Sequence, residues 1–464
     1  MILSTLASSS VLAANSMDLH LLPKGLSGAH ALDGSPTAYY FAQGASATTW
    51  VIFMQGGGAC YDEKSCTARS KTSLGTSTVL PAKHPGAESS LQSFDCTQNP
   101  LFCNATFAYI PYLSGDTHKG NRSTADAGSW NLYFQGHSSF VNIIATLKSQ
   151  HGLNSATHVV LTGDSAGGVG TFANVDWLQT ALPSAVVKGA PNAGWFFPGS
   201  LASDQPKYPN DPPSDWAHFS KNESGGRINS TFELVVSQLW EPIVNVECVA
   251  VEANPLDCGS VHVAYKYIKA PMFVVENQYD TNQLVAQEGA PRSPPSGSLG
   301  ATWRAYVVLY GASMRASTAQ VMTIPEKQGD GLFHPSCLQH GVGAETINGS
   351  GWVPIFNDWY WGLGKLTAQY KQVETCPASF NGLPCNPDAE KCQAPSPSPG
   401  PGPGPGPSPP SGGCSAQLKK DGCSTDKTTK LCETCAELHR KDLTAAGCTQ
   451  KEVVQLCKAV EVNY

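Results

Sequence analysis

A serine framed by glycines is the feature of this sequence best suited to chemistry. Gly163-Asp164-Ser165-Ala166-Gly167-Gly168 contains the pattern Gly-x-Ser-x-Gly. In this pattern the residues beside the serine must be small, because the chain turns sharply and leaves the hydroxyl exposed. A hydroxyl presented in this way can act as a nucleophile in acyl transfer once a base activates it. A chain with 45 glycines can contain the pattern by chance, so the flanking segments decide its meaning.

Those flanking segments predict a strand before the serine and a helix after it. Residues 157–162 form a short β-branched, apolar run, and residues 169–182 carry apolar side chains at helical spacing. A Gly-x-Ser-x-Gly between a strand and a helix is a nucleophile elbow. The sequence therefore predicts Ser165 as the nucleophile of a serine hydrolase.

A serine nucleophile needs a base, and the base needs a carboxylate to orient it. In hydrolases built on such an elbow these groups follow the serine in the order acid, then histidine. Asp280 is the favoured acid because it ends the strand-like run 271–279, whose carboxyl end is where catalytic loops gather. Asp257 and Asp330 are the alternatives, and neither follows so clear a strand.

Two histidines lie downstream of Asp280 and before the proline-rich segment, namely His334 and His340. Pro335 stiffens the chain directly after His334, while Cys337 offers an anchor for a loop that would present His340. Considered without any relative, the residues leave the choice between these two bases open.

The negative charge that develops on the substrate oxygen needs preorganised N–H donors. One donor is expected to be the backbone N–H of Ala166, directly after the nucleophile. The second is expected from the glycine-rich segment 55–60 after an early strand, with Gly57 and Gly58 as candidates.

The elements that must position these groups alternate along the chain. Strand-like runs cover 50–54, 107–110, 159–161, 186–187 and 272–275, and helical patterns lie between several of them, including 140–149. Such alternation predicts an α/β fold, with a mostly parallel sheet covered by helices.

Four segments are predicted. Residues 1–20 are a possible signal or targeting segment, 21–392 the α/β-hydrolase-like catalytic domain, 393–413 a Pro/Gly/Ser-rich linker, and 414–464 a small disulfide-rich module. The module has six cysteines and stands as a possible binder of a substrate or partner. Cys432 and Cys435 with His439 resemble half a zinc site, but a disulfide is the favoured reading, and no metal is expected.

Sixteen cysteines indicate an oxidising compartment, and ten of them precede the linker. Cys60–Cys66, Cys96–Cys103 and Cys248–Cys258 are plausible short disulfide loops. Five glycosylation sequons agree with a secreted glycoprotein, at Asn104, Asn121, Asn222, Asn229 and Asn348. The net charge of −7 without a long basic run argues against nucleic acid as a partner, and no stretch is apolar enough to predict a transmembrane segment.

Several motifs together resemble the pectin acetylesterase and Notum family. They are Gly-Gly-Gly-Ala-Cys at 56–60, Tyr-Ile-Pro-Tyr at 109–112, Gly-Asp-Ser-Ala-Gly-Gly at 163–168, Gly-Trp-Phe-Phe at 194–197 and Pro-Ser-Cys-Leu-Gln-His at 335–340. The resemblance covers roughly residues 30–375 and implies a serine carboxylesterase of α/β-hydrolase fold. It carries the triad onto Ser165, Asp280 and His340, and this chemistry needs no cofactor.

The resemblance implies as substrate an O-acetyl ester on a cell-wall or extracellular polysaccharide such as pectin. A Notum-like deacylase that removes a longer fatty acyl group from a protein is the rival reading. A non-catalytic extracellular binding protein on the same scaffold is the third. Ala59 stands where plant members typically carry tryptophan, and Leu113 where the family usually has cysteine. The sequence therefore does not predict the size and shape of the acyl pocket.

Overall fold

The computed structural model describes residues 16–86, 91–197, 230–287, 290–296, 298–363 and 367–387. The chain divides into two compact units, Met1–Ser396 and Pro397–Tyr464, and all described residues belong to the first. The predicted linker and six-cysteine module, including Cys432, Cys435 and His439, lie outside the described residues. So do residues 1–15 of the possible targeting segment.

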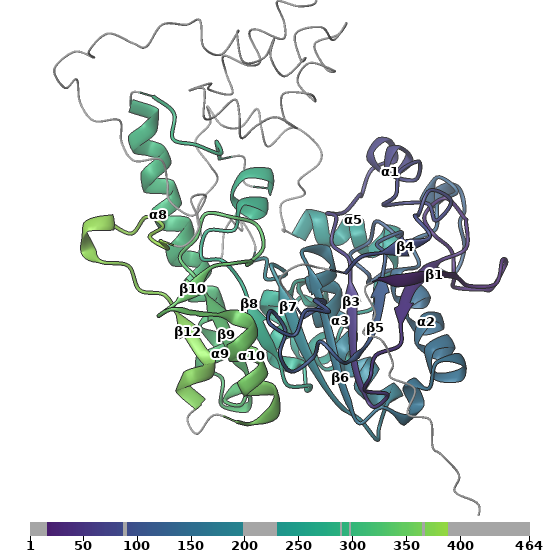
Figure 1. Cartoon of the computed structure of the whole chain (residues 1–464). Coiled ribbons are helices and arrows are strands. Elements are labelled where there is room, and N and C mark those ends of the chain that lie inside the picture. Colours follow the sequence, from purple (N-terminus) through teal and green to yellow (C-terminus); the bar gives the residue numbers. More distant parts are fainter. Residues whose placement is uncertain are drawn as a thin grey trace, which may run out of the picture. The chain divides into compact units, whose positions relative to one another are not determined.

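A ten-stranded sheet forms the centre of the first unit (Figure 1). Its strands follow one another in the order β12-β9-β8-β7-β6-β3-β5-β2-β1-β4. The pairs from β12 to β5 are parallel, and the pairs from β5 to β4 are antiparallel. The bounds are β1 Met17–Leu21, β2 Ala38–Ala42, β3 Thr49–Met54, β4 Lys83–His84, β5 Thr106–Ile110, β6 His158–Asp164, β7 Val186–Asn192, β8 Phe273–Val275, β9 Gly331–His334 and β12 Lys371–Val373.

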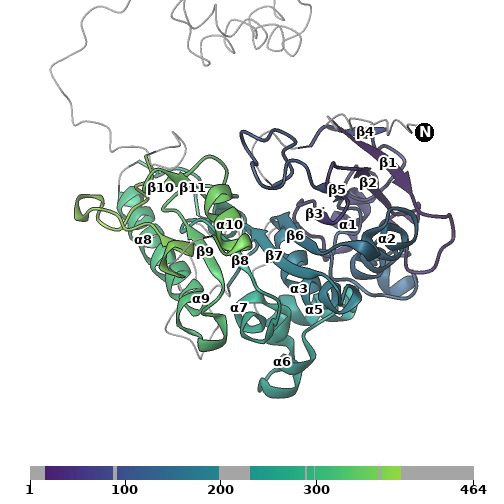
Figure 2. The ribbon, with the colours of Figure 1, turned by 60° about the horizontal axis from the view of Figure 1, so that its bottom comes forward.

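The described helices connect these strands and cover the sheet. They are α1 Glu63–Arg69, α2 Gly136–Gln150, α3 Ala166–Ala181, α5 Ser230–Trp240, α6 Val246–Val251, α7 Val261–Ala264, α8 Ser298–Thr318, α9 Gln320–Thr323 and α10 Trp352–Trp361. A small hairpin, β10 Thr346–Ile347 and β11 Ser350–Gly351, precedes α10. In Figure 2, α2 lies toward the part of the sheet that contains β1 and β2, and α8 toward the part that contains β9.

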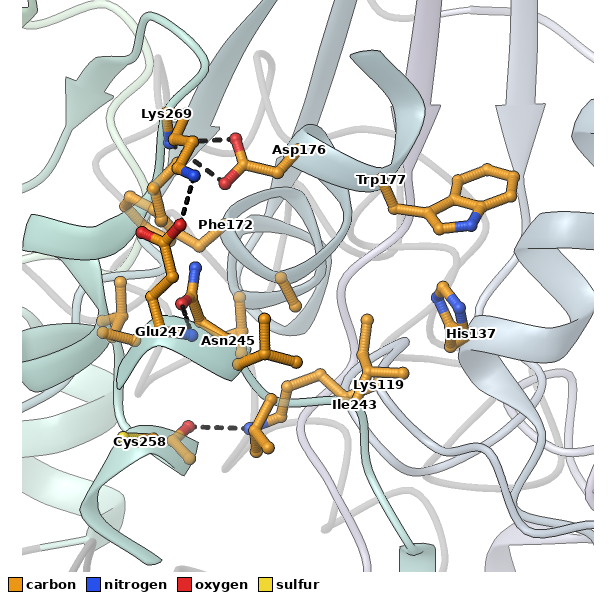
Figure 3. A pocket seen from close by; sticks show the side chains of 18 of the residues that line it. Lys119, His137, Phe172, Asp176, Trp177, Ile243, Asn245, Glu247, Cys258 and Lys269 are labelled. Atoms are coloured by element: carbon orange, nitrogen blue, oxygen red, sulfur yellow. Dashed lines mark hydrogen bonds and ion pairs between the residues drawn. The ribbon is translucent and has the colours of Figure 1, made fainter. Parts of the chain in front are cut away.

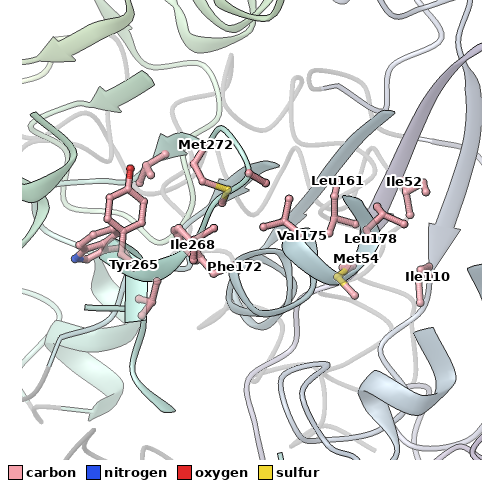
Figure 4. Packing of buried hydrophobic residues seen from close by; sticks show 14 of the residues in the cluster. Ile52, Met54, Ile110, Leu161, Phe172, Val175, Leu178, Tyr265, Ile268 and Met272 are labelled. Carbon is pink, nitrogen blue, oxygen red and sulfur yellow. The ribbon is translucent and has the colours of Figure 1, made fainter. Parts of the chain in front are cut away.

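Each strand presents alternate residues to two hydrophobic layers, because side chains along a strand point to opposite faces. Ile52 and Leu161 belong to the layer that includes α2, α3 and α8. Figure 4 shows part of that layer, where Phe172, Val175 and Leu178 of α3 gather with residues from the strands. Val51 and Phe53 belong to the opposite layer with α10, and their neighbours there include Phe356. The mostly parallel sheet between two apolar layers confirms the predicted fold class.

Three differences from the predicted elements concern the ends of elements. The run 271–279 forms a strand only over Phe273–Val275, after which polar residues leave the sheet. The helix predicted from residue 169 begins at Ala166, directly after the nucleophile. Strand β1 pairs with β2 and so brings residues 17–20 of the possible targeting segment into the sheet.

Disulfides close short loops around this sheet. Cys60–Cys66, Cys96–Cys103 and Cys248–Cys258 pair as expected, and Cys376–Cys385 is a further bond. Cys337 is also disulfide-bonded. Among the described residues, no helix is both long and apolar enough to cross a membrane.

Candidate active site

Ser165 occupies the strained turn between β6 and α3. Its backbone has φ 57° and ψ −120°, a conformation that non-glycine residues seldom adopt. The Ser165 N–H donates to the carbonyl of Asn192 at the end of β7, at 2.9 Å. The turn is therefore held to the neighbouring strand, and the α3 helix begins at the next residue.

The glycines around Ser165 are required by close backbone packing. A Cβ added to Gly167 would lie 1.9 Å from the carbonyl oxygen of Met54, and one added to Gly163 would lie 2.6 Å from the same atom. A Cβ on Gly56 would lie 2.9 Å from the Cβ of Ser165. The glycine-rich segment after β3 thus lies directly against the nucleophile turn.

Asp280 and His340 meet in a hydrogen bond, although 60 residues separate them. His340 Nδ1 lies 2.6 Å from Asp280 Oδ2. The other carboxylate oxygen of Asp280 accepts the backbone N–H groups of Asn282 and Gln283, at 2.9 and 3.0 Å. Asp280 is fully buried, whereas the His340 side chain is 30% exposed. The carboxylate accepts a hydrogen bond from the Nδ1–H group, so the Nε2 lone pair of His340 is left for proton transfer.

The other candidate residues do not join this pair. His334 is buried, with Nδ1 at 2.7 Å from the carbonyl of Glu276 and Nε2 at 3.3 Å from the Thr318 hydroxyl. Burial lowers the pKa of His334 to about 4. Asp330 instead binds the hydroxyl of Tyr265 and the N–H of Met272, and Asp257 accepts from Asn254.

The expected oxyanion donors are backbone N–H groups that belong to two well-defined turns. Within the described residues, the N–H groups of Gly57, Gly58 and Ala166 make no hydrogen bond. The carbonyl side of the glycine segment is held, since Arg69 Nη2 donates to the Gly57 carbonyl at 2.7 Å. Gly57 and Gly58 have φ of 149° and 68°, in the region that favours glycine.

Two further carboxyl groups lie beside this arrangement. Burial raises the pKa of Asp164 to about 6, against the opposing effects of the nearby His340 and of a hydrogen bond from Asn192. Burial, followed by the charge of Asp280, raises the pKa of Glu276 well above its usual range. Burial opposes protonation of His340, but Asp280 and then Asp164 outweigh it, so the pKa of His340 is raised.

Comparisons with known proteins identify the family of the chain. A family model described as Pectinacetylesterase matches residues 11–355, well over half of the chain. The chain belongs to the pectinacetylesterase family. This is a family of carboxylic ester hydrolases, so the resemblance inferred from the motifs is confirmed.

Curated relatives carry two kinds of name. The chain is 27% identical over 386 residues to pectin acetylesterase 5 of Arabidopsis thaliana, covering 78% of this chain and 81% of the relative. It is 30% identical over 272 residues to pectin acetylesterase 4 of the same plant, covering 58% and 60%. It is 26% identical over 334 residues to palmitoleoyl-protein carboxylesterase notum1a of Danio rerio, covering 70% and 59%.

The palmitoleoyl-protein carboxylesterases are longer than the region that matches. The chain spans 59% of notum1a and 58% of the mouse palmitoleoyl-protein carboxylesterase NOTUM. Among solved structures, the Wnt deacylase Notum from Drosophila matches with a TM-score of 0.62 at 23% identity. That match covers 80% of this chain and 100% of the other. At this identity it bears on the fold alone.

A cavity of ≈ 440 Å³ lies beside α3 in this member of the pectinacetylesterase family (Figure 3). None of Ser165, Asp280 and His340 lines it. Its walls include Phe172 and Trp177 of α3 and the segment that leads into α6. At its edge Lys269 pairs with Glu247.

Four residues around the site were missed by sequence reasoning: Asp164, Glu276, Asn192 and Asn277. Asp164 occupies a position of the Gly-x-Ser-x-Gly pattern that any residue can fill, so the pattern does not predict a role for it. The other three are polar residues at the carboxyl end of a strand, or directly after one. In a parallel sheet those ends gather at one edge, and that signal was available from the sequence.

Proposed function

We propose that this protein is a secreted serine carboxylesterase that hydrolyses O-acetyl esters of an extracellular polysaccharide such as pectin. The observation that carries the catalytic part is the 2.6 Å bond between Asp280 and His340, on the sheet edge where Ser165 occupies its strained turn. Membership of a family of carboxylic ester hydrolases supports the reaction class.

The proposed mechanism is a two-step ester hydrolysis through an acyl-enzyme. His340 Nε2 takes the proton from the Ser165 hydroxyl as the oxygen attacks the ester carbonyl, and Asp280 stabilises the imidazolium that forms. The N–H groups of Ala166 and of Gly57 or Gly58 donate to the tetrahedral oxyanion. The intermediate expels the alcohol, which takes the proton from His340. A water molecule, deprotonated by His340, then attacks the acyl-enzyme carbonyl. The second tetrahedral intermediate expels the Ser165 oxygen, which takes the proton back from His340, and the carboxylic acid is released.

The acetyl specificity rests on two supports. Pectin acetylesterase 5 matches over 78% of this chain and 81% of its own length. The segment 393–413 also resembles the Pro- and Ser-rich linkers of plant and algal cell-wall proteins, and a tethered module suits an insoluble substrate. Disulfides and exposed sequons at Asn104, Asn121 and Asn348 support secretion.

Removal of a long acyl group from a protein is the second candidate. Its support is the match to relatives named palmitoleoyl-protein carboxylesterase, which cover a similar share of this chain. Phe196 places an apolar ring beside the proposed base, with its ring centroid 6.5 Å from that of His340.

Hydrolysis of p-nitrophenyl esters from acetate to palmitate tests both candidates, with Ser165→Ala as the matched control. We expect serine-dependent activity that falls steeply beyond short chains, followed by serine-dependent acetate release from acetylated pectin. Activity that peaks at medium or long chains would replace the acetylesterase with the deacylase. A folded protein with no serine-dependent activity at any length would favour the binding-protein alternative.

A further inference from the structure

His340 lies in an irregular segment, residues 335–345, that follows β9 and contains neither helix nor strand. A base must be held within a fraction of an ångström for proton transfer, and irregular segments lack the hydrogen bonds that give helices and strands this precision. The contact with Asp280 holds the imidazole ring, but the backbone beneath it needs its own support.

Asn277 supports the backbone on both sides of His340. Its Nδ2 donates to the carbonyls of Gln339 and Gly341, at 3.0 and 2.8 Å. Asn277 is completely buried and lies three residues before Asp280. The segment that supplies the acid therefore also holds the chain on either side of the base.

Asn192 links the same segment to the nucleophile. Its side-chain amide pairs with the backbone of Val342 in both directions, with Nδ2 to the Val342 carbonyl and the Val342 N–H to Oδ1, each at 2.9 Å. Its own main-chain carbonyl accepts the N–H of Ser165 at 2.9 Å. One buried residue thus contacts the turn that carries the nucleophile and the segment that carries the base.

We infer that Asn277 and Asn192 are positioning residues that fix His340 between Asp280 and Ser165. The inference rests on the proposed function, since it assigns these two side chains a role in the same proton transfer. Neither acts on the reacting atoms. Both act through the main chain of residues 339–342, where a displacement of about 1 Å can lower the rate about 10²-fold.

The chain contains a matched control for Asn277. Asn99 is also completely buried, and its Nδ2 donates to the carbonyls of Leu91 and Ser93, at 3.0 and 3.2 Å. In both residues Oδ1 has no hydrogen-bond partner. Replacing either amide removes two hydrogen bonds from a side-chain nitrogen to backbone carbonyls. Only Asn277 holds the segment that carries His340.

The experiment compares Asn277→Leu with Asn99→Leu in the full chain, because leucine has a similar shape and cannot donate. Asn277→Asp repeats the test with an isosteric side chain. The measurements are kcat and KM on p-nitrophenyl acetate, the rate at which a fluorophosphonate labels Ser165, and urea unfolding. We expect Asn277→Leu to lower kcat and the labelling rate about 10²-fold with KM changed less than about threefold. Asn99→Leu should lose stability and retain kcat.

A smaller effect is expected for Asn192→Asp, which keeps the bond from the Val342 N–H and loses the bonds to the Val342 carbonyl and to Asp164. If Asn277→Leu keeps both kcat and labelling rate while losing stability as Asn99→Leu does, Asn277 is structural only and the inference fails. If the Asn277 variants do not fold, an unchanged kcat in folded Asn192→Asp overturns it.

The proton NMR signal of the bond between His340 and Asp280 gives a readout that does not need activity. We expect a downfield imidazole resonance in the wild type and in Asn99→Leu, and its loss or displacement in the Asn277 variants. A wild type with no esterase activity and no labelling would overturn the proposed function. The positioning role would still be decided, because an unchanged resonance in Asn277→Leu would contradict it.

Discussion

The proposed nucleophile and its proposed acid–base partners are positioned in two different ways. Ser165 belongs to one continuous piece of chain, in which β6, the turn and α3 follow without interruption from His158 to Ala181. Asp280 and His340 come from two segments 60 residues apart, and side-chain amides hold the second of these. The position of Ser165 is fixed by steric contacts within and beside one continuous piece of chain. The positions of Asp280 and His340 depend on hydrogen bonds between distant segments.

This difference predicts which substitutions each region tolerates. The nucleophile turn is held by backbone contacts that leave no room for a Cβ at Gly163 or Gly167, and α3 is fixed by apolar residues such as Val175 and Leu178, which are completely buried. The acid–base region should tolerate added bulk better but should be sensitive to the loss of single polar groups.

Removing either reacting group should have the largest effect. We expect Ser165→Ala and His340→Ala each to lower kcat by at least about three orders of magnitude. The double variant should be no worse than either one, because the residues act as a unit. Steady-state kinetics on p-nitrophenyl acetate measures this.

His334→Ala is the matched control for the base. It should unfold at a lower urea concentration because a buried side chain is lost, yet retain activity while folded. An inactive His334→Ala beside an active His340→Ala would reverse the assignment of the base.

The next largest effect is expected when a methyl group is added at the nucleophile turn. In Gly167→Ala the new Cβ would lie 1.9 Å from the Met54 carbonyl oxygen, so the end of β3 and the start of α3 must separate. We expect a loss of about 3 kcal/mol or more in the free energy of unfolding. Urea denaturation measures it against Gly329→Ala, where the added Cβ meets no atom within 4 Å. Equal stability of the two variants would contradict a steric origin for the turn.

The smallest expected effect is electrostatic and concerns Asp164. His340 must be neutral to accept a proton, so activity should fall as pH drops through its pKa. The charges of Asp280 and Asp164 raise that pKa against the effect of burial. Asp164→Asn removes one of them and should move the acid limb of the kcat/KM profile to lower pH, with little change in the plateau. An unmoved limb would show that Asp164 does not act on His340.

The contrast between the regions also explains what could be predicted. The central strands, the fold class and three disulfide loops could be inferred from the sequence, since each depends on residues close together in the chain. The turn at Ser165 belongs to the same category. The strands β1, β2 and β4 toward one edge of the sheet, and β9 and β12 toward the other, were not predicted, because these short strands are recognisable only from the sheet that they join.

The sequence by itself determined the nucleophile turn, because small residues, a strand and a helix within some twenty residues leave few conformations available to the serine. Without the family resemblance it could not choose between His334 and His340, which lie six positions apart. Tertiary structure favours His340, because it buries His334 between Glu276 and Thr318 and brings His340 to Asp280. It also decided the pKa of Asp164 and the contacts of Asn192 and Asn277. Burial and long-range hydrogen bonds exist only once distant segments have packed together.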